Sequence, residues 1–152
     1  MAYFLLVYKC KRKGGKNMSR VIFASHGELS IGMKDSVSMI IGDLAKDVET
    51  YSLYLGQNPE NYYQQLYAEA TSSNEQILIL CDIKGGSVHT ALSKLAVLEN
   101  VVVFSGMNIG LALSVLLGKD NLNEETLFHA VEDAREGITM LKELNQMREE
   151  DF

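Results

Sequence analysis

Residues 77–87 of the chain read ILILCDIKGGS. Residues 77–80 form a continuous apolar run rich in β-branched side chains, which predicts a buried strand that ends at Asp82. Residues 84–87 predict a turn, with Ser87 as the N-cap of a helix that reaches Leu98. A strand that is apolar throughout, and is followed by a helix, is typical of a parallel sheet covered on both faces.

The rest of the chain repeats this alternation of strand and helix. Further apolar runs predict strands at residues 21–24 and 101–104, and alternation predicts one at residues 48–55. Helices are expected at residues 29–41, 59–70 and 109–118, and a last one from Asn123 that Gly137 interrupts. The sequence therefore predicts an α/β fold, a single doubly wound domain with a central, mainly parallel four-stranded sheet. Residues 138–141 are either a short fifth strand or more helix.

The length of 152 residues, with 47% apolar and 22% charged residues, is typical of one globular domain. We expect residues 1–19 to be a basic leader, disordered or an artefact of the choice of start site. Residues 20–147 form the domain in this interpretation, and residues 148–152 form an acidic tail.

Charge and apolar runs exclude several classes of function. Residues 21–152 carry eight bases against 20 acids, a balance of −12, which would repel nucleic acid. No apolar run approaches the ~20 residues of a membrane-spanning helix, so direct membrane insertion is not expected. Cys10 and Cys81 lack the spacing of a redox or zinc motif, which fits a reducing cytoplasm.

Chemically active residues follow the predicted strands at the edge where a parallel sheet binds ligands. His26 follows the first strand and Asp82 the third, so the carboxylate can hold one imidazole nitrogen and leave the other as a nucleophile. The candidate anion-binding residues are Gly27, Gly85, Gly86 and Ser87. Ser25, Met107 and Asn108 are candidates for the rim of the site. This combination suggests reversible phosphorylation of His26. We expect His129 to be a surface or packing residue and His89 to be structural, with the rim of the site as the alternative for His89.

At these residues the sequence resembles the IIA component of the mannose/fructose/sorbose family of the bacterial phosphotransferase system (PTS). The resemblance covers most of residues 21–144. It rests on Gly32 and Ser36 and on three motifs in order, which are Ala24-Ser25-His26-Gly27, Asp82-Ile83-Lys84-Gly85-Gly86-Ser87 and Ser105-Gly106-Met107-Asn108. Relatives often have proline where this chain has Val88, which loosens the start of the helix but removes no chemical group.

The resemblance implies that His26 accepts a phosphoryl group from the phosphocarrier protein HPr and passes it to the IIB component. Sugar uptake then follows through the membrane components IIC and IID. Asp82 would orient His26, and Ser87 would help to hold the phosphoryl oxygens. The resemblance also implies a cytoplasmic homodimer that exchanges a C-terminal strand, for which residues 138–141 are the candidate. No metal or other cofactor is expected, and the sugar stays open.

Other functions are weighed against this hypothesis. The sequence Ser25-His26-Gly27-Glu28 differs by one residue from the opening motif of histidine-type phosphatases, whose arginine is replaced here by Ser25. A metal hydrolase would require a ligand spacing that is absent from the sequence. The alternative that we keep is the phosphotransfer subunit of a PTS-dependent dihydroxyacetone kinase, which shares the fold and the chemistry.

Overall fold

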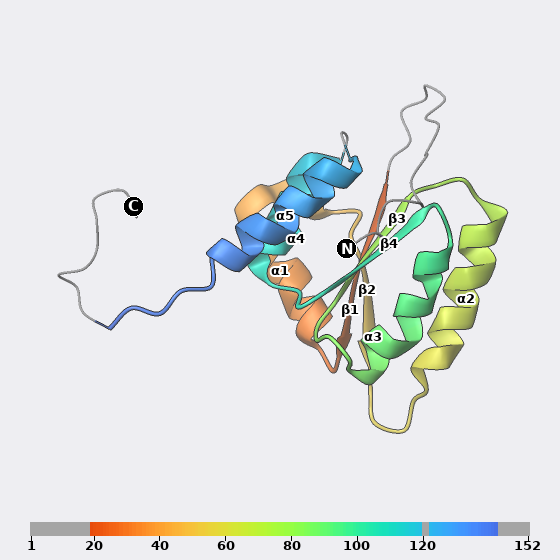
Figure 1. The fold of residues 1–152 in the computed structure, drawn as a ribbon. Coiled ribbons are helices and arrows are strands. Elements are labelled where there is room, and N and C mark those ends of the chain that lie inside the picture. The colour runs from red at the N-terminus through yellow and green to blue at the C-terminus, as the bar shows by residue number, and fades with distance from the viewer. Residues whose placement is uncertain (1–18, 120–121, 143–152) are drawn as a thin grey trace, which may run out of the picture.

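The structure is a computed structural model that describes residues 19–119 and 122–142. Its sheet has the strand order β2-β1-β3-β4, and every neighbouring pair is parallel (Figure 1). The strands are β1 (Arg20–His26), β2 (Glu49–Leu53), β3 (Ile77–Cys81) and β4 (Val101–Ser105). The predicted α/β fold is confirmed, and the sheet is parallel throughout.

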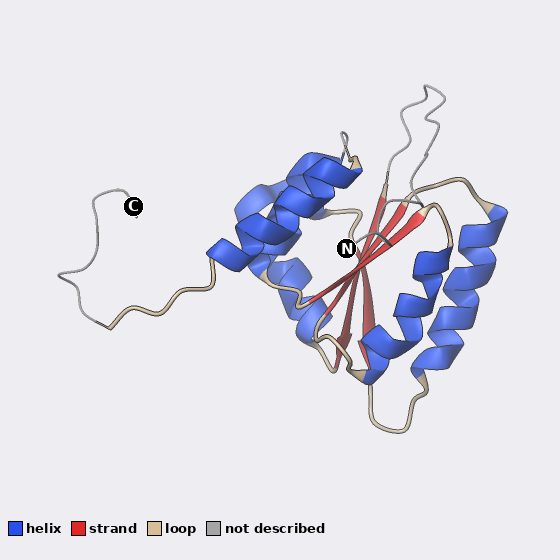
Figure 2. Ribbon diagram, viewed as in Figure 1, coloured by secondary structure: helices blue, strands red, loops and turns tan. Residues whose placement is uncertain are grey.

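Helices cover both faces of the sheet and make three layers (Figure 2). One face carries α1 (Leu29–Ile41), α4 (Ile109–Gly118) and α5 (Glu124–Glu136), with the short 3₁₀ helix η1 (Gly42–Ala45). The other face carries α2 (Pro59–Ser72), α3 (Ser87–Leu92) and the 3₁₀ helix η2 (Ser93–Val97). This arrangement confirms the doubly wound topology.

Successive strand residues point to opposite faces, so each strand supplies both halves of the core. In β1, Val21 and Phe23 pack with α1, α4 and α5, whereas Ile22 and Ala24 pack with α2 and α3. All five residues of β3 are buried. Burial on both faces explains why these strands have no alternating pattern in the sequence.

The helix expected over residues 87–98 is wrong in two respects. Its N-cap is Gly86, and Ser87, expected as the N-cap, is the first helical residue. Its α-helical part ends at Leu92, and the chain continues as the 3₁₀ helix η2, which closes with a bond from Leu98 N to Leu95 O. Residues three apart lie on the same side of a 3₁₀ helix. The tighter winding therefore buries Leu95 as well as Leu92.

Residues 138–141 form neither the short strand nor the continued helix that the sequence analysis expected there. α5 ends at Glu136, and residues 138–142 belong to no helix or strand. The apolar side chains of Ile138, Met140 and Leu141 are exposed there. The tail at 148–152 and residues 1–18 of the leader lie outside the described residues, and the domain boundary at 20–147 stays a prediction.

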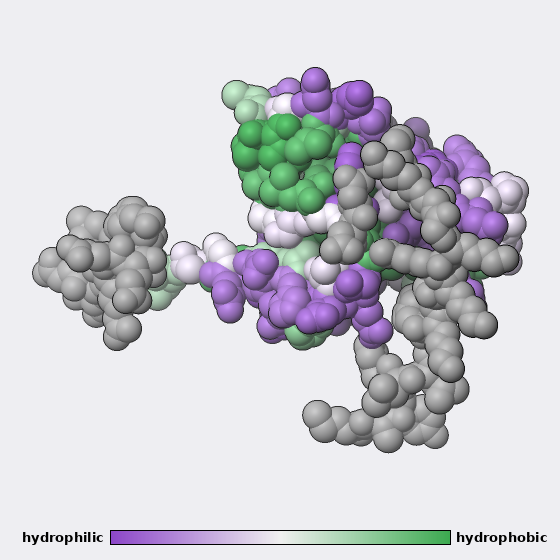
Figure 3. All heavy atoms as spheres, turned by 90° about the horizontal axis from the view of Figure 1, so that it is seen from above, coloured by the Kyte–Doolittle hydropathy of each residue, from purple (hydrophilic) through white to green (hydrophobic). Residues whose placement is uncertain are grey.

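An apolar area lies on the side of α1 and α4 when the molecule is seen from the amino ends of the strands (Figure 3). Exposed apolar residues toward the carboxyl ends of α1 and α4, and in η1, are Met39, Ile40, Leu44 and Leu117. This end of the sheet is opposite to His26, which ends β1. Within the part of the chain that the structure describes, no helix combines the length and apolarity needed to cross a bilayer.

Candidate functional site

His26 and Asp82 meet because β1 and β3 are neighbours in the centre of the sheet. Asp82 follows β3, and its backbone N–H donates to Ala24 O at 3.0 Å, which fixes it beside the end of β1. The His26 ring then lies with Nδ1 2.7 Å from Asp82 Oδ2. The backbone N–H of His26 donates to the same oxygen at 2.8 Å. Sheet topology alone therefore brings the two predicted residues together.

The Asp82 carboxylate is almost enclosed, with 9% of its side chain exposed. Burial by itself would raise the pKa of Asp82, but hydrogen bonds from the backbone and ring of His26, and from Ile83 N, outweigh it. The net result is a pKa below the ordinary aspartate range. Asp82 is thus an anion that can accept a hydrogen bond from the Nδ1–H of His26 over a wide range of pH.

This carboxylate selects the tautomer of His26. With the proton on Nδ1 and directed at Asp82, Nε2 keeps its lone pair. Nε2 lies 2.9 Å from Ser87 Oγ, whose hydroxyl can donate to it. The His26 side chain is 44% exposed, so a visiting molecule can reach the ring. The arrangement supplies an oriented nucleophilic nitrogen with a hydroxyl beside it.

Two different constraints favour glycine at the positions around His26, namely backbone conformation and lack of space for a side chain. Gly27 and Gly85 adopt left-handed conformations, with φ of 54° and 81°, which side chains rarely tolerate. Gly86 has ordinary dihedrals, but a Cβ there would lie 3.0 Å from His26 Cε1 and 2.8 Å from Ile83 Cγ2. The His26 ring therefore packs directly on the backbone of the turn.

Ser25, expected at the rim, is fully buried and does not line the site. Its hydroxyl accepts from Ser30 N at 2.7 Å and donates to Gly27 O at 3.2 Å. Ser30, which is also fully buried, contacts Tyr51 O at 3.0 Å and Ser52 Oγ at 2.9 Å. These bonds tie the loop after His26 to α1 and β2. The sequence signal for this role is a serine at an inward position of a buried strand.

The other two rim candidates, Met107 and Asn108, have mainly structural roles. Met107 is 7% exposed, and its backbone N–H donates to Cys81 O at 3.0 Å. Asn108 is the N-cap of α4, where its side chain accepts from Leu111 N at 2.8 Å. Both residues shape the loop after β4 at the same edge of the sheet.

His89 has a contact that the sequence analysis did not anticipate. Its Nδ1 accepts a hydrogen bond from Gly85 N at 3.2 Å, within the turn that faces His26. The available signal was its spacing, since His89 lies four residues after Gly85 in the first turn of α3. His129, by contrast, is a surface residue of α5 with 65% of its side chain exposed.

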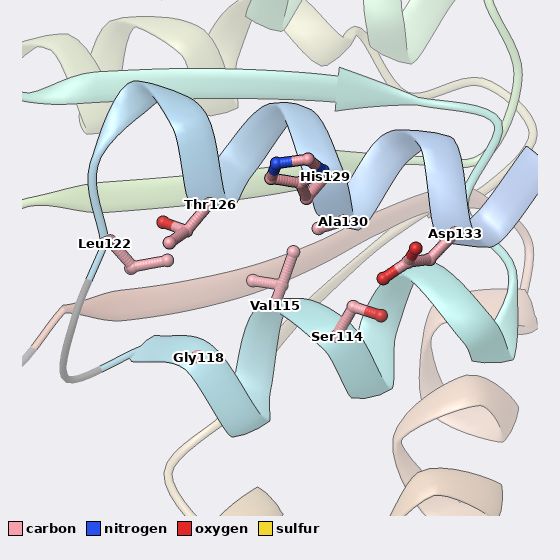
Figure 4. Close-up of a pocket in the computed structure, with 8 residues that line it drawn as sticks. All are labelled: Ser114, Val115, Gly118, Leu122, Thr126, His129, Ala130 and Asp133. Atoms are coloured by element: carbon pink, nitrogen blue, oxygen red, sulfur yellow. The ribbon is translucent and has the colours of Figure 1, made fainter.

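A separate hollow lies between α4 and α5, toward the amino ends of the strands (Figure 4). Its volume is about 240 Å³, and its polar lining includes Ser114, His129 and Asp133. It contains none of the residues around His26. Within residues 19–119 and 122–142, no three His, Cys, Asp or Glu side chains are grouped as a metal site.

The arginines of the described chain are engaged away from His26. Arg20, at the opposite end of β1, pairs with Glu49 and Glu69 at 2.7 and 3.0 Å. Arg135 contacts Glu132 at 3.1 Å. Histidine-type phosphatases grip phosphate with arginine forks. Among the described residues, the site offers no such fork.

Comparison with known proteins decides the family. A family model described as the PTS system fructose IIA component matches residues 20–132. The chain belongs to this family. The matched range includes His26, Asp82 and Ser87, so the IIA family match covers the whole site. Membership identifies the protein as a phosphotransferase system component and implies phosphoryl transfer in sugar uptake.

Individual IIA proteins agree with this assignment. The sorbose-specific EIIA component of Klebsiella pneumoniae is 29% identical over 112 residues, which are 72% of this chain and 82% of that protein. The IIA protein associated with the fucose utilization operon of Streptococcus pneumoniae has a TM-score of 0.69 and 26% identity, covering 84% of this chain and 96% of that one. The mannose/sorbose specific IIA subunit of Enterococcus faecalis shares the fold, with a TM-score of 0.70, 21% identity and coverage of 82% and 95%.

Proposed function

We propose that this IIA protein carries a phosphoryl group on Nε2 of His26, receiving it from phosphorylated HPr and passing it to a IIB component. The observation that carries the proposal is the hydrogen bond of 2.7 Å between Nδ1 and Asp82. It occupies one ring nitrogen and leaves the other for attack. The 44% exposure of the ring admits the partner imidazole that an exchange between two proteins requires.

The exchange needs little besides positioning and charge stabilisation. Nε2 of His26 attacks the phosphorus of phosphohistidine in HPr, a new N–P bond forms, and the N–P bond to the donor breaks with its electron pair returning to the donor ring. The Nδ1 proton of His26 stays in place, and the Asp82 anion balances the positive ring. Ser87 Oγ then donates to a phosphoryl oxygen in place of Nε2. No cofactor enters the step.

The test is incubation of the protein with phosphoenolpyruvate, enzyme I and HPr. We expect an acid-labile, base-stable label on the wild-type protein and none on His26→Ala. His129→Ala is the matched control, because it removes another exposed histidine that lies outside the site. It should be labelled like the wild type. Equal labelling of His26→Ala would contradict the proposal.

The partners follow from the same exchange. IIB accepts the phosphoryl group and phosphorylates the sugar that enters through IIC and IID, in the cytoplasm. The acidic balance of residues 21–152 suits docking to basic partner surfaces, where charge complementarity mainly accelerates association. Discharge of labelled protein by a purified IIB component tests this half of the cycle. A label that leaves equally fast without IIB would indicate hydrolysis instead.

A homodimer with an exchanged C-terminal strand is part of the proposal. β4 is an edge strand with one neighbour, and unpaired edges accept further strands. Ile138, Met140 and Leu141 offer exposed apolar side chains immediately after α5. Sedimentation should give a dimer mass, and deletion of residues 138–152 should shift it to the monomer. A monomeric full-length chain would exclude the exchange.

A further inference from the structure

His89 forms a hydrogen bond with the Gly85–Ser87 turn, which faces His26. Gly85 N donates to His89 Nδ1 at 3.2 Å, so His89 must be neutral there and carry its proton on Nε2. The ring is on the first turn of α3, and Gly85 is the residue before the N-cap, Gly86. In a capping box the third helical side chain, usually glutamate or glutamine, accepts from the N-cap N–H; His89 has that position but reaches one residue further back, to Gly85.

Two longer hydrogen bonds also hold this turn, from Gly86 N to Ile83 O at 3.3 Å and from Thr90 Oγ1 to Gly85 O at 3.4 Å. The N-cap of α3 is Gly86, which has no side chain to accept from the helix. The first turn of α3 contains Val88 and no proline that would fix its backbone. Gly85 is in a left-handed conformation, and glycine there leaves the backbone free to relax. The bond to His89 is thus a restraint on the most adaptable residue of the turn.

The position of this turn matters because it is in direct contact with the His26 ring. Ser87 Oγ lies 2.9 Å from Nε2, and Gly86 is packed so closely that a Cβ would come within 3.0 Å of Cε1. Gly85, Gly86 and Ser87 are consecutive. Movement of Gly85 therefore moves the hydroxyl that faces the reactive nitrogen.

We propose that His89 is a positioning residue for phosphoryl transfer, which holds the Gly85–Ser87 turn so that Ser87 faces Nε2 of His26. This inference rests on the proposed function. His89 acts through the turn, since its hydrogen bond is with Gly85 and not with His26. Its role predicts an effect on the rate of transfer within the complex and little effect on the binding of HPr.

The test compares His89→Leu, which has no acceptor, with His89→Gln, which keeps one. Initial rates of transfer from labelled phospho-HPr are measured against donor concentration. We expect the maximal rate of His89→Leu to fall roughly fivefold to tenfold, the value of one ordinary hydrogen bond. The donor concentration for half-maximal rate should stay unchanged, and His89→Gln should stay within about twofold of the wild type.

Hydrogen exchange of the Gly85 amide is the second readout. The amide should exchange faster in His89→Leu than in the wild type and recover protection in His89→Gln. A maximal rate for His89→Leu equal to that of the wild type, or an equal loss in both variants, would overturn the inference and leave the proposed function intact. Absence of label on His26 in the wild type would instead remove the proposed function.

The wild-type protein provides a test that needs no variant, should His89→Leu fail to fold. Nitrogen-15 NMR of the histidine rings should show the neutral form of His89 protonated on Nε2. A proton on Nδ1 would leave nothing to accept the Gly85 N–H, and the inference would fall.

Discussion

Gly86→Ala should slow phosphoryl transfer, because the added methyl group would press on the His26 ring. The backbone of Gly86, with φ of −67° and ψ of 164°, is one that alanine adopts freely. The added Cβ would nevertheless lie 3.0 Å from His26 Cε1 and 2.8 Å from Ile83 Cγ2. Carbon atoms in contact are about 3.5–4.0 Å apart, so the methyl group overlaps the ring by roughly 0.5–1.0 Å.

The overlap must be relieved by movement of a neighbour. Ile83 is 58% exposed and can turn away into solvent. His26 is held by Asp82 through two hydrogen bonds, so relief there shifts the ring relative to Ser87 or strains those bonds. A displacement near 1 Å can cost about 10²-fold in rate. We therefore expect transfer from phospho-HPr to slow about tenfold to a hundredfold, with about 1–3 kcal/mol lost in stability.

The matched control is Gly118→Ala at the end of α4, where a Cβ meets no atom within 4 Å. This change should leave the transfer rate unaltered and raise the free energy of unfolding by up to about 1 kcal/mol. Rates come from rapid-quench labelling and stabilities from urea unfolding followed by circular dichroism. If Gly86→Ala transfers within twofold of the wild-type rate while folded, the packing argument for His26 is wrong.

Four further outcomes follow from the same contacts. Asp82→Asn removes the charge that holds Nδ1, so single-turnover labelling should slow roughly tenfold to a hundredfold, and an unchanged rate would show that the carboxylate is not needed. Because the folded pKa of Asp82 is depressed, its contribution to stability is present above about pH 4 and is lost as pH falls through the folded value, so urea midpoints of the wild type and Asp82→Asn should converge in acid. Ser25→Ala leaves the buried N–H of Ser30 without its acceptor and should cost about 1–3 kcal/mol in urea unfolding, against less than about 0.5 for the partly exposed Ser38→Ala. Burial raises the pKa of Cys81 to about 12, so iodoacetamide at neutral pH should modify this thiol only after unfolding, as peptide mass spectrometry would show.

The sheet and the main pair of the site were predictable because both follow from one property of the sequence. A strand that is apolar at every position, such as Ile77–Cys81, has both faces covered and belongs to a parallel sheet. Once the strands are parallel, residues that follow them meet at one edge, which predicts that His26 and Asp82 lie side by side. The positions of His26 and Asp82 directly after two predicted strands are enough for this prediction.

The parts that sequence reasoning missed depend on side-chain direction and on helical winding. Ser25 occupies the same face of β1 as Phe23, where α1 covers it, so a polar residue next to the site became a buried restraint on the loop. The chain after α3 continues with 3₁₀ winding, and Leu95 is buried there against the sheet. Neither outcome is encoded in residue type or spacing alone, since each depends on what packs above the segment.

The geometry separates the group that reacts from the groups that hold it in place. His26 is nearly half exposed, yet Asp82 and Ser87 contact its two ring nitrogens. Asp82 is in turn fixed by two backbone N–H groups, those of His26 and Ile83, and the loop after His26 is fixed by the buried hydroxyl of Ser25. A carrier must expose its nucleophile to two different proteins, so its ring cannot be enclosed for rigidity. The structure achieves rigidity by enclosing Asp82 instead, while Ser87 stays exposed beside the ring, and this is why a change at the enclosed carboxylate should alter the rate of transfer.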